Sequence, residues 1–348
     1  MNLSRLAGAS SVLAVLLFLH LPSLAQAPIQ VFIFAGQSNA QGYGIRIQLD
    51  PVPLWAQVAS AGWTGAPTAS SDSGIRYEHP SLKNAPMLSN ETVGSTVVNM
   101  WCGYEGSTPA IAWPSGLPTG KCTEMSDFGP ELSFLARYRE DHPGVPLAAI
   151  KVGLGGTSIK DWLPGGNAYP FLNSMISEAA RRLNAAGLTY KWAGFIWMQG
   201  ENGASTPYAL VNTDPKVTYS FQLRQFLTIV RGWTSAEMPV AIGRISNSME
   251  APNIINPLVS AGVCKPYTTG LTPYAACVAA TELRRNQQVL VGLDRGNTWW
   301  DNDNLPVRQS GPPAEWYHFT GAGYLAMGER AYAAFAQLQA SAQDSEDR

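Results

Sequence analysis

Short apolar segments rich in β-branched residues recur along this chain and alternate with segments of helical periodicity. The apolar segments span residues 31–34, 146–152, 193–198 and 239–245, with a less regular fifth one within 289–300. Helical patterns cover residues 130–139, 169–186, 219–233, 281–291 and 321–339, the last with Thr320 as its N-cap. Strands that alternate with helices form a parallel sheet with helices on both faces. The sequence therefore predicts an α/β fold.

Two long segments interrupt this alternation, at residues 45–127 and 246–280. The first is rich in Gly, Pro, Ser and Trp, and a structureless loop of that length is rare within a compact domain. We therefore expect it to be an irregular insertion that forms one wall of a site. The chain then comprises a single domain over residues 26–340 and a polar tail, 341–348, which we expect to be disordered.

Residues 1–25 have the layout of a secretory signal peptide. Arg5 precedes an apolar stretch over residues 6–21, and small residues follow. Cleavage after Ala27 would leave Pro28 first, so we predict cleavage after Ala25. The apolar stretch is short for a membrane span of about 20 residues. We therefore expect a secreted or periplasmic protein that has no membrane association after signal cleavage.

Four cysteines would then lie in an oxidising compartment. Four cysteines allow three pairings, and proximity in the sequence favours Cys102–Cys122 and Cys264–Cys277. A zinc site is the alternative, but the chain has no Cys-x-x-Cys spacing and only four histidines. We predict two disulfides and no metal.

Ser38 lies on a turn at the end of the first predicted strand. Residues 31–39 are an apolar run, then Gly36 and Gln37, then Ser38 and Asn39. A serine in this position is where an exposed nucleophile is placed. The nucleophile elbow of α/β-hydrolases does not explain it, because several strands precede the serine there and one precedes it here.

A serine nucleophile needs a base, and histidine is the usual one. The four histidines are His20, His79, His142 and His318. His20 leaves with the signal peptide, and the next two each precede a proline, which is typical of turns. His318 lies just before the last predicted helix, where an α/β fold builds its site. The carboxylate that would orient it stays open among Glu315, Asp301 and Asp303, since spacing alone does not decide.

Four blocks in this order resemble the SGNH (GDSL-like) hydrolases, in the branch of sialate O-acetylesterases and the acetyl xylan esterases of carbohydrate esterase family 6. The blocks are Gly36-Gln37-Ser38-Asn39; Gly155-Gly156-Thr157-Ser158-Ile159 with Asp161-Trp162; Trp197-Met198-Gln199-Gly200-Glu201; and Glu315-x-x-His318 with Phe319-Thr320. The resemblance implies a flavodoxin-like three-layer α/β/α sandwich and a serine esterase that acts on acetylated sugars. The family usually has Asp-x-x-His in the last block, so the glutamate at position 315 is a departure.

The resemblance also implies roles for single residues. Ser38 is the nucleophile, His318 the base and Glu315 its carboxylate partner, with Glu201 as the alternative partner. The oxyanion donors are the backbone N–H groups of Ser38 and Gly155 and the side-chain amide of Gln199. Asn39 is expected to support the serine turn. Trp162 and Trp316 flank these blocks, so we expect them to stack on sugar rings.

The expected substrate is an acetylated carbohydrate, and we expect no cofactor. A formal net charge of -2 with 14% charged residues argues against a nucleic-acid partner. The single catalytic domain favours acetylated xylan-like polysaccharide, and O-acetylated sialic acid is the alternative substrate. Two other functions stay open: a carbohydrate-binding protein that has lost catalysis, which the glutamate at 315 favours, and a lipase or thioesterase of the same fold.

Overall fold

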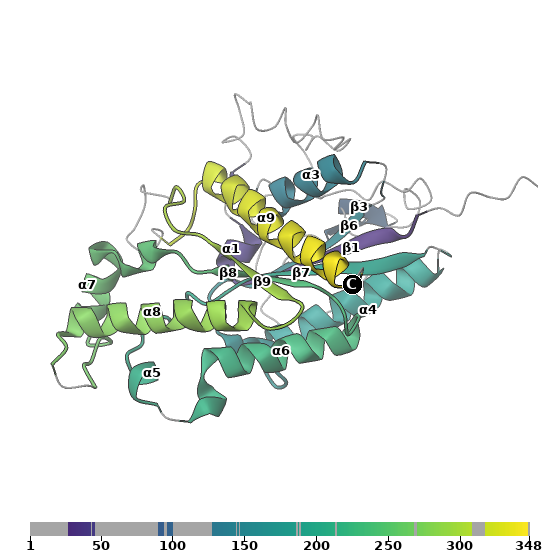
Figure 1. The fold of residues 1–348 in the computed structure, drawn as a ribbon. Helices are drawn as coiled ribbons and strands as arrows, with labels where there is room; N and C mark the ends of the chain where they lie inside the picture. The colour runs from purple at the N-terminus through teal and green to yellow at the C-terminus, as the bar shows by residue number, and fades with distance from the viewer. Residues whose placement is uncertain are drawn as a thin grey trace, which may run out of the picture.

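Five parallel strands form the central sheet of the computed structural model (Figure 1), in the spatial order β6-β1-β7-β8-β9. The structure describes residues 27–42, 44–45, 90–93, 96–99, 127–143, 145, 147–185, 187, 189–212, 214–267, 270–307 and 317–346. The strands are β1 (Ile29–Gly36), β6 (Leu147–Gly153), β7 (Tyr190–Met198), β8 (Val240–Arg244) and β9 (Asn297–Asp301). All five predicted strands are confirmed. In chain order they lie as 2-1-3-4-5, the flavodoxin-like arrangement, which confirms the predicted fold class.

Helices cover both faces of this sheet, as predicted. Helices α3 and α9 lie on one face, and α4, α6 and α8 lie on the other (Figure 1). They are α3 (Glu131–Asp141), α4 (Ala168–Ala185), α6 (Tyr219–Trp233), α8 (Pro273–Gly292) and α9 (Gly321–Glu346).

Two of these helices are longer than the sequence pattern indicated. Helix α8 begins at Pro273, because the Thr272 side chain caps it and proline is well suited to the first helical turn. Helix α9 has the predicted cap, in which the Gly323 N–H donates to Thr320 Oγ1 at 3.2 Å. It continues to Glu346, so the prediction of a disordered tail was wrong for residues 341–346, which contain no helix-breaking Gly or Pro.

The core forms on both faces of β1 because its side chains alternate in direction. Val31 and Ile33 pack into the cluster under α4 and α6, while Phe32 packs into the cluster under α3 and α9. There the Phe32 ring meets Phe134 and Phe335 edge-on, at centroid distances of 5.3 and 5.7 Å. A strand buried on both faces has a nearly continuous apolar sequence, which is why these segments were recognisable.

The order of the strands fixes where a site can form. From β1 the chain goes outward to β6 on one side, then crosses to β7 on the other side. The loops after β1 and β7 therefore diverge, and a crevice opens between them at the carboxyl ends of the strands. This crevice receives Ser38 and the Gln199-Gly200-Glu201 segment.

The two insertions differ in how much of them the structure describes. In the first, β2 (Gly44–Ile45) pairs antiparallel with β5 (Asp127–Phe128), so its two ends lie together, and β3 (Asn90–Val93) pairs with β4 (Thr96–Asn99). The second contains the 3-10 helix η5 (Asn247–Glu250), α7 (Pro252–Ser260) and the start of α8. It also contains the predicted Cys264–Cys277 disulfide, which is confirmed.

Several predictions fall on residues outside those that the structure describes. They are the signal peptide at residues 1–25, the Cys102–Cys122 disulfide, and the side chains of Glu315 and Trp316. Within the described residues, no helix has both the length and the apolar character that a bilayer span requires.

Candidate active site

A sharp turn at the end of β1 presents Ser38. Gly36 has a φ of +144°, and a Cβ added there would lie 1.9 Å from the carbonyl oxygen of Met198 in the adjacent strand β7, so a larger residue does not fit. The chain then enters the short helix α1 (Ser38–Gln41), whose first residue is Ser38. Ser38 is 5% exposed and lines a cavity.

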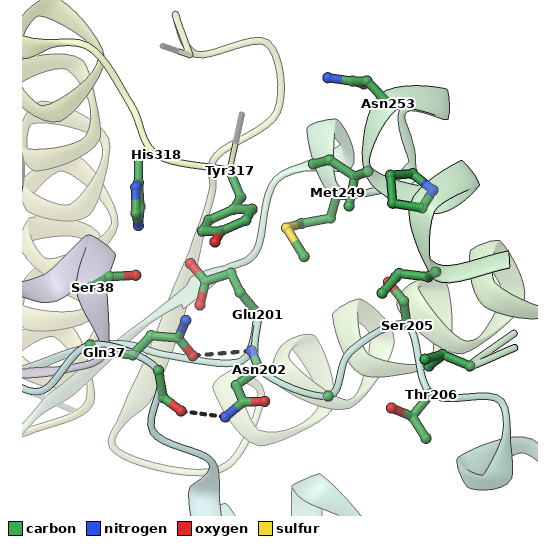
Figure 2. A pocket seen from close by; sticks show the side chains of 17 residues that line it. Gln37, Ser38, Glu201, Asn202, Ser205, Thr206, Met249, Asn253, Tyr317 and His318 are labelled. Carbon is green, nitrogen blue, oxygen red and sulfur yellow. Dashed lines mark hydrogen bonds between the residues drawn. The ribbon is translucent and has the colours of Figure 1, made fainter. Parts of the chain in front are cut away.

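The cavity has a volume of about 740 Å³, and its lining includes the base predicted from the sequence, His318. Figure 2 shows Ser38 and His318 at the same end of the cavity, with Tyr317 and Glu201 beside them. Gly155, in the loop after β6, also lines it. The structure thus brings three of the predicted residues, Ser38, Gly155 and His318, from separate segments to one cavity at the carboxyl end of the sheet.

The side chain of Asn39 connects the serine turn to the loop that carries His318. Its Nδ2 donates to Glu201 Oε1 at 2.6 Å and to the carbonyl oxygen of Tyr317 at 2.9 Å. Its Oδ1 accepts from the hydroxyl of Tyr324, in α9, at 2.9 Å. Asn39 therefore supports the serine turn, as predicted, and it also fixes the backbone next to His318.

Glu201 is a buried carboxylate at the wall of the cavity. It is 7% exposed, and among the described residues its Oε2 has no hydrogen-bond partner. Burial raises the pKa of Glu201 above its ordinary value, although the hydrogen bond from Asn39 and the charge of Arg284 act in the opposite direction. The Arg284 guanidinium itself donates to the Gly200 carbonyl at 3.0 Å and lies over the Tyr219 ring at 4.4 Å.

Gln199 is held inside the protein and does not face the cavity. Its Nε2 donates to Gln37 Oε1 at 3.1 Å and to the carbonyl oxygen of Thr157 at 2.9 Å, which engages both amide hydrogens. The prediction that Gln199 donates directly to an oxyanion does not fit this arrangement. Gln37 Oε1 also accepts from the backbone N–H groups of Gly200 and Asn202, at 3.3 and 3.2 Å. Gln199 and Gln37 therefore fix the loops around Ser38.

Two backbone donors remain available at the cavity. Neither the N–H of Ser38 nor that of Gly155 donates to an acceptor among the described residues. The loop that carries Gly155 is held by the hydrogen bond from Leu154 N to Gly36 O, at 2.9 Å, and by the Asn202 side chain, which donates to the Gly156 carbonyl. Either N–H group can therefore donate to an oxygen bound in the cavity without first breaking a hydrogen bond to the described residues.

Trp162 is not a sugar-binding residue, so this prediction was wrong. Its side chain is fully buried, and its ring packs edge-on against Trp197 at a centroid distance of 5.1 Å. Its Nε1 donates to Thr157 Oγ1 at 3.0 Å. Nearby, the Asp161 carboxylate accepts from the backbone and the hydroxyl of Ser158, at 2.7 and 2.9 Å. The Thr-Ser-Ile-Lys-Asp-Trp segment thus stabilises its own turn beside the site.

The two aspartates that could have oriented His318 are engaged elsewhere. Asp301 pairs with Arg244 at 2.6 Å, and Asp303 pairs with Arg244 and Arg285 at 2.8 and 2.7 Å. Burial alone would raise the pKa of Asp303, but the hydrogen bonds from Arg285 and Asn247 and the charges of the two arginines together outweigh burial, and the pKa is lowered. Neither aspartate lines the cavity.

Sequence reasoning missed Asn202 and Tyr317, which both line the cavity. Each lies directly beside a residue that was identified, Glu201 or His318. That adjacency was a usable signal, but their hydrogen-bond partners lie 46 and 278 residues away in the sequence. Such partners become visible only in the folded chain.

We expect Glu201→Gln to melt a few degrees above wild type at pH 7. Because burial raises the pKa of Glu201 in the folded state, the contribution of this carboxyl group to wild-type stability is fully present below pH 4.5, its ordinary pKa. That contribution is lost as the pH rises through the folded-state pKa. The advantage of the variant should therefore shrink as the pH falls toward 4. Thermal unfolding between pH 4 and 8 measures it, with the exposed Glu237→Gln as control. A variant less stable than wild type at pH 7 would contradict this.

A comparison with known protein families places the middle of the chain, which contains two of the four blocks, in a family. The family model described as "carbohydrate esterase, sialic acid-specific acetylesterase" matches residues 108–291, more than half of the chain, and includes Gly155 and Glu201. The matched segment lies between Ser38 and His318 in the sequence. No curated protein matches the chain.

Among solved structures, NanS is 13% identical, with 91% of this chain and 99% of NanS covered and a TM-score of 0.49. A protein from Arabidopsis thaliana is 16% identical over 89% of this chain and 98% of its own length, with a TM-score of 0.48. A carbohydrate acetylesterase from Xanthomonas citri is 16% identical over 89% of this chain and 56% of its own length, with a TM-score of 0.42. Because these TM-scores are below 0.5, the assignment rests on the sequence match. The chain belongs to the family of carbohydrate esterases described as sialic acid-specific acetylesterases.

Proposed function

We propose that this protein is a serine esterase that removes acetyl groups from sugar hydroxyls. The observation that carries the proposal is that Ser38 and His318 line the same cavity, together with Gly155, and that the N–H groups of Ser38 and Gly155 donate to no acceptor among the described residues. A nucleophile, a base and oxyanion donors are the groups that acyl transfer requires. Family membership supplies the reaction class, deacetylation of a carbohydrate.

In the proposed mechanism, Ser38 Oγ attacks the acetyl carbonyl carbon while His318 takes the hydroxyl proton. The N–H groups of Ser38 and Gly155 donate to the oxyanion of the tetrahedral intermediate, a contribution of roughly 3–4 kcal/mol for one donor in a related case. His318 then gives the proton to the departing sugar oxygen, which leaves an acetyl-enzyme. A water activated by His318 hydrolyses this ester and releases acetate, so Ser38 is regenerated.

Two carboxylates are proposed as partners of His318. The last sequence block favours Glu315, three residues before the histidine. Glu201 is the alternative, because its Oε1 and the Tyr317 carbonyl both accept from Asn39, which places the carboxylate near the His318 loop. Either glutamate would stabilise the cation that forms when His318 takes the serine proton.

The charge of the cavity supports a neutral sugar as substrate. In the described part of the chain, no lysine or arginine lines the cavity, and Glu201 is the one acidic side chain that does. A sialic acid carries a carboxylate, which would find no lysine or arginine among these lining residues and would be repelled by an ionised Glu201. We therefore propose acetylated xylan-like polysaccharide as substrate, with O-acetylated sialic acid, to which the family description points, as the alternative.

We also propose that the protein works outside the cytoplasm. The Cys264–Cys277 disulfide supports this, because such bonds persist mainly in oxidising compartments.

Ser38→Ala and His318→Ala should each lower the rate of hydrolysis of p-nitrophenyl acetate by at least about 10⁴-fold, since both residues act as a unit. Thermal melting of each variant controls for folding. Acetate release by wild type that survives in Ser38→Ala would refute the proposed mechanism. Wild type with no esterase activity at all would favour the carbohydrate-binding alternative.

Glu315→Gln and Glu201→Gln, compared on the same ester, separate the two carboxylates. The partner of His318 should lose about 10³- to 10⁴-fold in kcat, because the neutral amide no longer stabilises the histidine cation. The other variant should lose much less. We expect the larger loss in Glu315→Gln; the reverse order would assign the role to Glu201.

Acetate release from acetylated xylan and from O-acetylated sialic acid, measured side by side, tests the substrate. We expect kcat/KM to be at least about tenfold higher on xylan, because the described residues that line the cavity include no lysine or arginine to pair with the carboxylate of a sialic acid. A preference for the sialic acid ester would reverse the assignment. Activity that rises steeply with acyl chain length on aryl esters would instead favour a lipase.

A further inference from the structure

Two tyrosines form an exposed aromatic pair outside the site described above. Tyr208 begins the short helix α5 (Tyr208–Val211), and Tyr267 lies between α7 and α8. Their side chains are 55% and 52% exposed, and their rings meet edge-on at a centroid distance of 5.9 Å. Single exposed apolar residues are common on soluble proteins. A pair built from segments nearly 60 residues apart, as the numbering shows, is less easily explained by chance.

Both tyrosines closely follow, in the sequence, residues that line the active-site cavity. Thr206, two residues before Tyr208, lines the cavity, and so does Val263, four residues before Tyr267. Val263 is itself 41% exposed, so the cavity wall continues to the surface there. Figure 2 shows Thr206 at the end of the cavity opposite Ser38 and His318.

Both tyrosines are held in place by the surrounding structure. The Cys264–Cys277 disulfide ties the segment that carries Tyr267 to α8. Pro207 directly precedes Tyr208, and α5 packs against α8. A surface fixed before a ligand arrives loses less conformational entropy on binding than a mobile one.

We propose that Tyr208 and Tyr267 bind a second sugar ring of the saccharide whose acetylated sugar reaches Ser38. The C–H groups on one face of a pyranose pack on aromatic rings, and the tyrosine hydroxyls can hydrogen-bond to sugar hydroxyls. Between the pair and Ser38 the cavity offers the uncharged polar side chains of Asn202 and Thr206. The inference rests on the proposed function and extends it: the substrate is a neutral saccharide of several units, not an isolated acetylated sugar.

Binding of unacetylated xylohexaose, mannohexaose and cellohexaose, measured by calorimetry on the full-length protein, tests this without any hydrolysis. Wild type should bind at least one hexaose. Tyr208→Ala/Tyr267→Ala should weaken that affinity about tenfold, because two stacking surfaces are lost. Tyr208→Phe/Tyr267→Phe keeps the rings and should stay within about threefold of wild type. Leu293→Ala, a change at a 70% exposed apolar residue on another surface, is the matched control.

Steady-state kinetics provide a second test. The expected change in how KM depends on saccharide length is one that a general loss of stability would not produce. On acetylated xylo-oligosaccharides the alanine variant should raise KM about tenfold, and its KM should no longer fall with increasing saccharide length. Equal affinity of the alanine variant and wild type for the hexaose, or no binding of any hexaose by wild type, overturns the inference. Failure of the proposed function is distinct, since it would appear as esterase activity that survives in Ser38→Ala.

Discussion

The hydrogen bonds of one side chain, Asn39, hold the candidate site together. Its amide donates to Glu201 and to the carbonyl of Tyr317, and it accepts from Tyr324. These partners belong to the loop after β7, the loop that carries His318, and helix α9. A buried amide that uses its donors and acceptor in this way fixes orientation as well as position. The position of His318 relative to Ser38 therefore depends on a residue that takes no part in the proposed chemistry.

The parallel sheet supplies the setting for this interaction. Strands β1, β6 and β7 are neighbours and end at the same edge, so the loops that follow them lie side by side. Gly36 permits the close approach to Met198 that turns the chain toward Ser38. The side-chain amides of Gln37 and Gln199 then link the loops to one another. The loop that carries Gly155, a proposed oxyanion donor, is held by hydrogen bonds from the Leu154 N–H and the Asn202 side chain.

The insertion over residues 246–280 determines how far the site extends. Its apolar side chains, including Met249 and Leu258, line the cavity. The Cys264–Cys277 disulfide fixes the insertion against α8. The sheet thus positions the residues of the proposed reaction. The disulfide-linked insertion forms the part of the cavity wall that an extended saccharide would contact. A cavity of about 740 Å³ is far larger than an acetyl group needs, which agrees with a bulky alcohol portion of the ester.

The sequence by itself determined the strands and most helices, and it singled out Ser38 and His318, which both line the cavity, because apolar periodicity and short motifs are local properties. It identified Asn39 as a support, yet could not show that its partners lie 162 to 285 residues away. Only the tertiary structure decided that Trp162 is core and that the Gln199 amide is already engaged, because burial and hydrogen-bond partners depend on segments that folding brings together. The same reason explains why Tyr208 and Tyr267, unremarkable in the sequence, emerge as a pair.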